Sequence, residues 1–310
     1  MLPFKLIYHE RYDLNLGAHV FPSQKYRLIK NKLLGDGIAQ NDDFLRPEPA
    51  LDSDLLRVHS QDWIGKLKTG TLTLSDVMKL EVPYSPELVS AFWLAAGGTI
   101  LAAQTALQHG FGCNIGGGFH HAHAGHGEGF CAIHDVAVAI RRMQADGTIR
   151  KAMVVDTDVH HGNGTASLFE KDDSVFTLSI HQLNNYPAHK PPSNVDLDMA
   201  DNVGDRKYLD TLFPAVRSSI DSFRPDMIFY VGGADPYRDD QLGGLKLTMK
   251  GIYSRDSGIF EEARKRQIPV VTVLAGGYAR RVEDTVQIHV NTILAARDVA
   301  AKYPAPSSEY

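Results

Sequence analysis

The stretch KAMVVDTDVHHGNG, residues 151–164, passes from an apolar run rich in valine into carboxylates, imidazoles and glycines. An apolar run followed by glycines predicts a buried strand that ends near Asp158. Side chains alternate along a strand, so Asp156, Asp158 and His160 share one face. Two carboxylates side by side in an apolar setting resist ionisation unless a cation joins them. We therefore expect a metal ion where this strand ends.

Further apolar runs of the same kind alternate with helix-like stretches along most of the chain. Strands are predicted over residues 4–9, 111–117, 151–158, 174–180, 226–233 and 268–277, and helices over 86–109, 131–146, 205–222, 248–266 and 281–299. Because the strands are apolar almost throughout, they suit a parallel sheet with helices on both faces. The predicted fold class is α/β, a single three-layer doubly wound domain with a mainly parallel central sheet. This domain is expected over residues 1–302, followed by a flexible tail over 303–310.

Composition narrows the classes of function. The 310 residues carry a formal net charge of -5 and no long basic run, which argues against direct nucleic-acid binding. Cys113 and Cys131 are the only two cysteines, too few for a disulfide framework or a thiolate zinc site. We find no signal peptide and no apolar stretch approaching ~20 residues, so we expect no membrane span and a cytoplasmic protein. The sequence leaves the oligomeric state open.

Chemically reactive side chains follow four of the predicted strands, at ends that meet along one edge of a parallel sheet. They are His120, His121, Asp158, His160, Asp235 and Tyr278. Two carboxylates and an imidazole can hold a zinc ion and leave a position for water. A histidine pair offers acid–base catalysis, and a tyrosine hydroxyl can donate to a developing oxyanion. Taken one at a time, these residues also fit structural roles, such as a turn cap for Asp235.

Four motifs in this order carry a family resemblance: GGGFHHA (116–122), DTDVHHGNG (156–164), GGADPYRDDQLGG (232–244) and AGGY (275–278). Together they resemble the zinc-dependent histone deacetylase family of the arginase–deacetylase fold. The resemblance extends through FPSQKYRLI (21–29), DLLRVHSQDWIGKL (54–67) and LGGLKLTMKGI (242–252). The asparagine of HHGNG and the tyrosine of AGGY are most similar to the class IV branch.

The resemblance implies two kinds of metal site. Asp158, His160 and Asp235 match the ligands of one zinc ion per chain. A structural potassium ion would use the side chains of Asp156 and Ser179 and the backbone carbonyls of Asp158, His160 and Ile180. A second, weaker potassium match lies around Phe169, Asp172 and Val175.

The resemblance also implies the catalytic residues. His121 matches the general base that activates the attacking water and later protonates the leaving amine. His120 matches its companion, oriented by Asp156, and Tyr278 matches the residue that polarises the scissile carbonyl together with the zinc. Asn163 stands where many relatives carry an aspartate paired with the base, so we expect His121 to stay neutral more readily here.

A substrate channel is implied as well. Phe130 matches one wall of a narrow channel for the acyl-lysine stem, and Tyr186 is expected on the opposite wall. Gly118 is expected near the floor of the site together with Gly116 and Gly117. These small residues would leave room for an acyl tail longer than acetyl.

The remaining histidines near the site are given structural roles. His123, His126 and His134 are expected on loop or helix surfaces. His161 is expected behind the sheet, and His181 in a local hydrogen bond. We therefore expect no second set of metal ligands to converge.

These observations predict a zinc-dependent amidohydrolase that removes acyl groups from the ε-amine of lysine in proteins or peptides. Acetylpolyamines and other small acyl-amides remain an alternative substrate class, since the scissile amide is the same. A binuclear manganese hydrolase of the arginase type is disfavoured because Gly162, Gly233 and Tyr237 stand where further carboxylates would be needed. A catalytically silent acyl-lysine-binding module is disfavoured because the ligands, the histidine pair and the tyrosine are all present.

Overall fold

Eight strands form one sheet in the computed structural model, which describes residues 1–14, 16–17 and 19–304. In chain order they are β1 (Lys5–Ile7), β2 (Phe44–Leu45), β3 (Phe111–Asn114), β4 (Ala152–Asp156), β5 (Val175–Gln182), β6 (Val195–Met199), β7 (Met227–Val231) and β8 (Val270–Val273). Their order across the sheet is β2-β1-β3-β8-β7-β4-β5-β6, and every pairing between neighbours is parallel. The carboxyl ends of all these strands therefore meet along one edge, where sheets of this kind bind their ligands.

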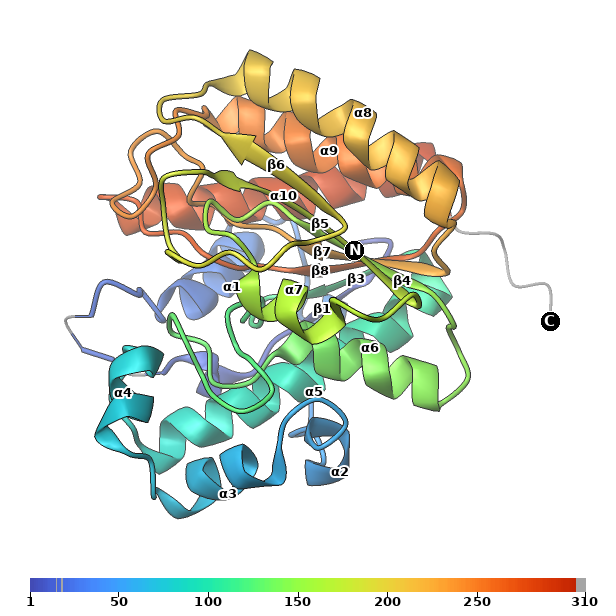
Figure 1. Ribbon diagram of the computed structural model, residues 1–310. Coiled ribbons are helices and arrows are strands. Elements are labelled where there is room, and N and C mark those ends of the chain that lie inside the picture. The colour runs from blue at the N-terminus through green and yellow to red at the C-terminus, as the bar shows by residue number, and fades with distance from the viewer. Residues whose placement is uncertain (15, 18, 305–310) are drawn as a thin grey trace.

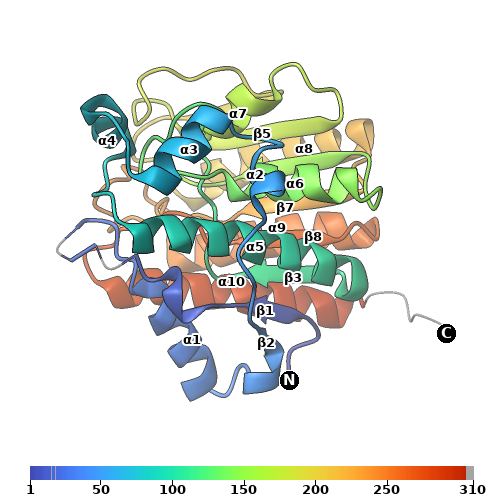
Figure 2. The ribbon, with the colours of Figure 1, turned by 90° about the horizontal axis from the view of Figure 1, so that it is seen from below.

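Helices cover both faces of the sheet. They are α1 (Lys25–Gly35), α2 (Asp52–Leu55), α3 (Gln61–Thr69), α4 (Leu74–Leu80), α5 (Pro86–His109), α6 (Asp135–Ala145), α7 (Asn163–Phe169), α8 (Asp205–Phe223), α9 (Met249–Lys265) and α10 (Val282–Lys302). In Figure 1, α8, α9 and α10 lie above the sheet and α3, α5 and α6 lie below it. Figure 2 shows α5 and α6 in front of the strands when the molecule is seen from below. This arrangement confirms the predicted three-layer α/β fold.

The central strands are apolar because both of their faces are covered. Every residue of β7 and β8 is buried, which explains the unbroken apolar runs that identified these strands. The edge strand β6 alternates between half-buried and exposed positions before its last residue. The sequence analysis missed β6 and the two-residue β2, because neither forms a continuous apolar run.

Helix α5 begins and ends where the sequence predicted. The Ser85 hydroxyl accepts a hydrogen bond from a first-turn amide at 3.0 Å, Pro86 occupies the first position, and Gly110 ends the helix with a φ of 79°. Gly97 lies where a Cβ atom would be 1.9 Å from the Glu48 carbonyl oxygen. The glycine is therefore explained by close packing of this helix.

Within the described residues, α5 is also the one helix whose length and composition would let it cross a membrane. The prediction that no apolar stretch approaches this length overlooked it. In the structure, 78% of its most apolar window is buried inside the protein. Packing in the core thus accounts for the apolar character of this helix.

The other differences concern short elements and chain ends. Helices α1, α2, α3, α4 and α7 were not predicted. Four of them, α2, α3, α4 and α7, have 4, 9, 7 and 7 residues, which is too short for a clear helical repeat of apolar residues, whereas α1 has 11. Helix α10 continues to Lys302, and Tyr303 follows as its half-buried C-cap, packed against the core. Of the predicted tail, residues 305–310 lie outside the described part of the chain.

Candidate active site and metal centre

The three predicted zinc ligands meet at the carboxyl ends of β4 and β7, which pair with each other. His160 Nδ1 lies 3.0 Å from Asp158 Oδ1 and 3.5 Å from Asp235 Oδ2. One ligand atom from each of the three residues lies within 4.8 Å of the others, and all three side chains are buried. The fold therefore brings Asp235 next to Asp158 and His160, which lie 75 or more positions earlier in the chain.

Backbone amides hold the two carboxylates without satisfying them. The Val159 amide donates to Asp235 Oδ1 at 2.9 Å, and the Gly276 amide donates to Asp158 Oδ2 at 2.9 Å. Asp235 Oδ2 is buried and has no hydrogen-bond partner among the described residues. Burial and the neighbouring Asp158 carboxylate raise the pKa of Asp235 to about 7. A shared cation would relieve this conflict, and two carboxylates with one imidazole are a donor set that fits zinc.

A buried arginine holds the two ligand-bearing loops together. Arg255 on α9 donates from Nη1 to the carbonyl oxygens of Thr157 at 3.1 Å and Gly233 at 2.9 Å. Its guanidinium pairs with Asp256 at 2.8 Å, and both side chains are wholly buried. The sequence analysis missed Arg255, because an arginine on an amphipathic helix is usually exposed.

The histidine pair lies beside the ligands, and each ring has its own partner. His120 Nδ1 lies 2.7 Å from Asp156 Oδ2, and His121 Nδ1 lies 2.6 Å from Asn163 Oδ1. The two ring centroids are 4.0 Å apart. Both contacts are the ones that the family resemblance implied. With Nδ1 of His121 held by Asn163, its Nε2 is left to exchange a proton.

The pKa values of the two histidines move in opposite directions. Burial lowers the pKa of His120, but the carboxylates of Asp156 and Asp158 outweigh burial and raise it to about 9. Burial and the imidazoles of His120 and His160 bring the pKa of His121 well below its usual 6.5. A ring that is neutral near pH 7 can accept a proton, so the arrangement suits His121 as a base beside a charged companion.

Asn163, the first residue of α7, links His121 to a carboxylate that sequence analysis missed. Its Nδ2 donates to Glu128 Oε1 at 2.9 Å and contacts His123 Nε2 at 3.2 Å. Glu128 Oε1 also accepts from the Tyr186 hydroxyl at 3.1 Å. Glu128 lies between two glycines, and no pattern in the sequence distinguishes it from a solvated loop residue.

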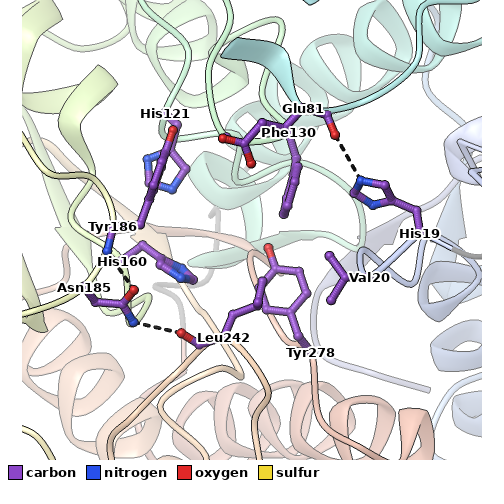
Figure 3. A pocket seen from close by; sticks show the side chains of 11 residues that line it. His19, Val20, Glu81, His121, Phe130, His160, Asn185, Tyr186, Leu242 and Tyr278 are labelled. Atoms are coloured by element: carbon purple, nitrogen blue, oxygen red, sulfur yellow. Dashed lines mark hydrogen bonds between the residues drawn. The ribbon is translucent and has the colours of Figure 1, made fainter. Parts of the chain in front are cut away.

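A cavity of about 380 Å³ opens onto these residues. Phe130 and Tyr186 face each other across it, and His121, His160 and Tyr278 line it as well (Figure 3). Aromatic walls with a few polar groups between them suit an apolar stem that carries an amide. The structure thus places both predicted wall residues along one cavity.

The Tyr278 hydroxyl points into the same cavity (Figure 3). The Tyr278 amide donates to Asp240 Oδ2 at 2.7 Å, and its carbonyl accepts from the Gln241 amide at 3.1 Å. Burial, with the carboxylates of Asp158 and Asp235, raises the pKa of Tyr278 well above its usual 10.0. The hydroxyl therefore keeps its proton and can donate a hydrogen bond.

Gly118 lies outside the 380 Å³ cavity and lines a smaller inner one of about 20 Å³ together with Gly117. A Cβ atom at Gly118 would lie 2.8 Å from the Cβ of Ala275, and one at Gly116 would lie 2.8 Å from the Tyr12 ring. A space of this volume holds about one water molecule. In this conformation the three glycines do not provide the room for a longer acyl tail that the sequence suggested.

The predicted potassium ligands lie at and just after the end of β4 and within β5. Asp156 and Ser179 are partners in the strand register, and both are buried, as is Ile180. The Ser179 hydroxyl contacts His181 Nδ1 at 3.0 Å, which is the local hydrogen bond expected for His181. The ion itself stays a prediction.

The residues of the second potassium match form a tight turn between α7 and β5. The Asp172 amide donates to the Phe169 carbonyl at 3.1 Å, and the Val175 amide donates to the Asp172 carbonyl at 3.1 Å. The structure therefore brings these residues together, and an ion there also stays a prediction.

Two expectations for the other histidines are wrong. His134 is buried, not on a surface: its Nδ1 accepts from the Ala137 amide at 3.2 Å to cap α6, and its Nε2 contacts Thr165 Oγ1 at 2.8 Å. Further sets of candidate metal ligands also converge. Within the described part of the chain, two groups besides the predicted zinc ligands have ligand atoms within 4.8 Å of one another. They are His123 with His126 and Glu128, and His161 with His181 and Asp196.

Comparison with known proteins places this site in a family. The family profile of the histone deacetylase domain matches residues 19–293. An uncharacterized protein of Picosynechococcus sp. is 38% identical over 297 residues, which cover 96% of this chain and 99% of that protein. Histone deacetylase 2 of Arabidopsis thaliana is 31% identical over 299 residues, which cover 91% of this chain and 77% of that protein.

A solved structure shares the fold. The crystal structure of the HDA15 HD domain matches with a TM-score of 0.77 at 24% sequence identity, covering 96% of this chain and 94% of that one. The span matched by the family profile contains the metal ligands, the histidine pair and the cavity residues described above. The chain belongs to the histone deacetylase family.

Proposed function

We propose that this protein is a zinc-dependent amidohydrolase, most similar to the class IV branch, that removes acyl groups from the ε-amine of lysine in proteins or peptides. One observation carries the proposal. A buried set of two carboxylates and an imidazole lies beside two histidines whose pKa values are driven apart, at a cavity with aromatic walls. Amide hydrolysis needs these groups together, because the carbonyl must be polarised, water deprotonated and the amine protonated.

The side chains of this protein account for the proton transfers. His121 accepts a proton from the attacking water through Nε2, because Asn163 holds its Nδ1. His121 then gives that proton to the amine nitrogen as the carbon–nitrogen bond breaks, which yields a carboxylic acid and an amine. Transfer of the acid proton to the amine leaves a carboxylate and a protonated amine. Tyr278 donates a hydrogen bond to the carbonyl oxygen as negative charge develops on it.

His120, paired with Asp156, keeps a positive charge close to this oxygen. Bound by Asp158, His160 and Asp235, a zinc ion would supply Lewis-acid polarisation of the carbonyl and lower the pKa of water towards ~7. Arg255 keeps the two loops that carry these ligands in register.

The cavity supports lysine as the amine, because Phe130 and Tyr186 face each other where an apolar methylene stem would pass. A second substrate class, the acylpolyamines, is favoured by one observation. The exposed Glu81 lines the same cavity and offers a carboxylate to a second ammonium group of a polyamine. Family membership supports deacetylase chemistry in both cases, and the scissile amide is identical.

A panel of substrates compared by kcat/KM tests the proposal. We expect acyl-lysine peptides to exceed N-acetylpolyamines, and Glu81→Gln to change the ratio of the two values little. A higher kcat/KM for the polyamines, with a selective loss in Glu81→Gln, would establish the alternative. The absence of turnover on both classes by the zinc-loaded protein would refute an amidohydrolase.

The same panel measures the preferred length of the acyl chain. The class IV resemblance supports acyl groups longer than acetyl, whereas the inner cavity of about 20 Å³ supports acetyl. We retain the prediction that longer chains are accepted. An equal or higher kcat/KM on acetyl-lysine than on every longer acyl-lysine would contradict it.

A further inference from the structure

A second group of metal-binding side chains lies outside the active site, in the loop between β3 and α6. We call His123, His126 and Glu128 the outer cluster. The two imidazole rings are stacked, with centroids 4.5 Å apart and an angle of 11° between their planes. Nε2 of His123 lies 3.7 Å from Glu128 Oε2, and Nε2 of His126 lies 3.4 Å from the same oxygen. A hydrogen bond from the His123 amide to the His126 carbonyl, 3.0 Å long, closes the turn that stacks the rings.

The hydrogen bonds around Asn163 determine that two hydrogen-bond acceptors, His123 Nε2 and Glu128 Oε2, face each other. Oδ1 of Asn163 is used by His121, so its Nδ2 donates one hydrogen to Glu128 Oε1 and the other to His123 Nε2. His123 Nε2 therefore carries a lone pair and no hydrogen. It accepts the Asn163 hydrogen at 3.2 Å and lies 3.7 Å from Glu128 Oε2. A cation between this nitrogen and the carboxylate oxygen would take the place of the Asn163 hydrogen on His123, whereas the bond from Asn163 to Glu128 Oε1 would stay.

Two members of the outer cluster, His123 and Glu128, have the protonation states of metal ligands. Burial lowers the pKa of His123, so that its ring is neutral. Hydrogen bonds, first that from His126 and then those from Asn163 and Tyr186, lower the pKa of Glu128 to about 2. Metal ions bind neutral imidazole and ionised carboxylate.

We propose that the outer cluster binds a divalent transition-metal ion of the zinc type through His123 Nε2, His126 Nε2 and Glu128 Oε2. Ligands about 2.1 Å from a tetrahedral zinc ion lie about 3.4 Å from one another, which is close to the nitrogen–oxygen separations present here. The three side chains are 16%, 31% and 22% exposed and line a cavity of about 580 Å³, so an ion has a path from solvent and water can complete its coordination.

The outer cluster and the active site share Glu128. Its Oε2 faces the two histidines, while its Oε1 accepts from Asn163 and from Tyr186. An ion on Oε2 would leave both of those hydrogen bonds in place. The outer ion would therefore fix the carboxylate that positions Asn163, which in turn holds His121.

Metal counting on four forms of the full-length protein separates this site from the catalytic one. Each form is equilibrated with a zinc buffer, dialysed and analysed for bound zinc. We expect two ions in the wild type, one in His126→Ala, one in Asp235→Ala, and none in the double variant. His109→Ala, at the end of α5 and outside the cluster, is the matched control and should bind two.

His126→Ala removes an outer ligand with the least effect on the active site. The His126 ring contacts Glu128, and among the described residues it makes no hydrogen bond to Asn163 or Tyr186. His126→Gln is the second variant, and circular dichroism and thermal melts verify folding. In Asp235→Ala loaded with Co²⁺, the outer site should give visible d–d absorption that disappears when His126→Ala is added.

The outcomes for the two sites differ. An equal zinc content in the wild type and in both His126 variants would overturn the outer site and leave the proposed function untouched. An Asp235→Ala protein that binds as much zinc as the wild type would overturn the catalytic metal and leave the outer site standing. Absence of Co²⁺ absorption in folded Asp235→Ala would also overturn the outer site.

Discussion

Replacing Asn163 by aspartate tests the contact that distinguishes the two active-site histidines. The substitution keeps the shape of the side chain and puts a carboxylate oxygen beside His121 Nδ1, where Asn163 Oδ1 now lies at 2.6 Å. A carboxylate favours the imidazolium form, so the pKa of His121 rises. A general base acts in its neutral form, so the acidic limb of the kcat/KM profile moves to higher pH.

His120 indicates how far a carboxylate can raise the pKa of His121. Both are buried imidazoles, but the partner of His120 is a carboxylate. Asp156 and Asp158 raise the pKa of His120 to about 9, whereas the pKa of His121 beside an amide falls well below 6.5. At position 163 only one new charge appears, and it would lie next to Glu128, which now accepts from Asn163 at 2.9 Å. A proton shared between these two carboxylates would weaken the effect.

We therefore expect the pKa of His121 to rise by about 1–2 units, the lower part of the range for an opposite charge in contact. This corresponds to about 1.4–2.7 kcal/mol. The assay is a kcat/KM profile against pH for the wild type, Asn163→Asp and Asn163→Ser on one acyl-lysine peptide, with zinc contents matched. Asn163→Ser adds no charge, so its acidic limb should not move to higher pH. An Asn163→Asp limb that stays in place or moves to lower pH would refute the pairing or the role of His121 as base.

Three further predictions concern the metal, the tyrosine and the buried arginine. Tyr278→Phe should keep its zinc and lose about 100- to 1,000-fold in kcat, as measured by steady-state kinetics; a near-normal kcat would exclude the hydrogen bond to the oxyanion. Removal of metal by a chelator should abolish turnover and added zinc should restore it, whereas an apoprotein that retains turnover would contradict the proposed chemistry. Arg255→Met should lower the free energy of unfolding by about 3–5 kcal/mol in urea, because it leaves the buried Asp256 without its counter-charge; a loss below about 1 kcal/mol would show that the pair contributes little.

The parts of the fold that the sequence predicts are those with one dominant physical cause. β7 and β8 are buried on both faces, so their apolar runs are unbroken. α5 has a serine cap, a proline at its first position and a glycine at its end. β6 lies at the edge of the sheet, and its alternating half-buried and exposed residues resemble those of a loop. Its position depends on pairing with β5, a contact that the residues of β6 alone do not encode.

The site residues that were predicted follow from the sheet topology, whereas those that were missed depend on contacts that no local pattern encodes. Asp158, His160 and Asp235 stand at the ends of strands, where the topology alone brings them together. Glu128 and Arg255 act through contacts that form only in the folded chain. The Glu128 carboxylate contacts Asn163, and the Arg255 guanidinium contacts two carbonyl oxygens. Their residue types give no signal by themselves, because a glutamate in a glycine-rich loop and an arginine on a helix are usually solvated.

Steric packing around the metal ligands bears on the alternative of a binuclear manganese site. Such a site needs further carboxylates beside the ligands, and Gly162 and Gly233 stand at two of the positions where they would be required. A Cβ atom at Gly162 would lie 2.4 Å from Asp156 Oδ2, and one at Gly233 would lie 2.6 Å from the Cα of Asp158. Real Cβ atoms do not approach other atoms this closely, so a side chain at position 162 would displace the Asp156 carboxylate and one at position 233 would displace the backbone of Asp158. Packing therefore argues against two of the additional ligands and supports our proposal of a single zinc ion at the active site.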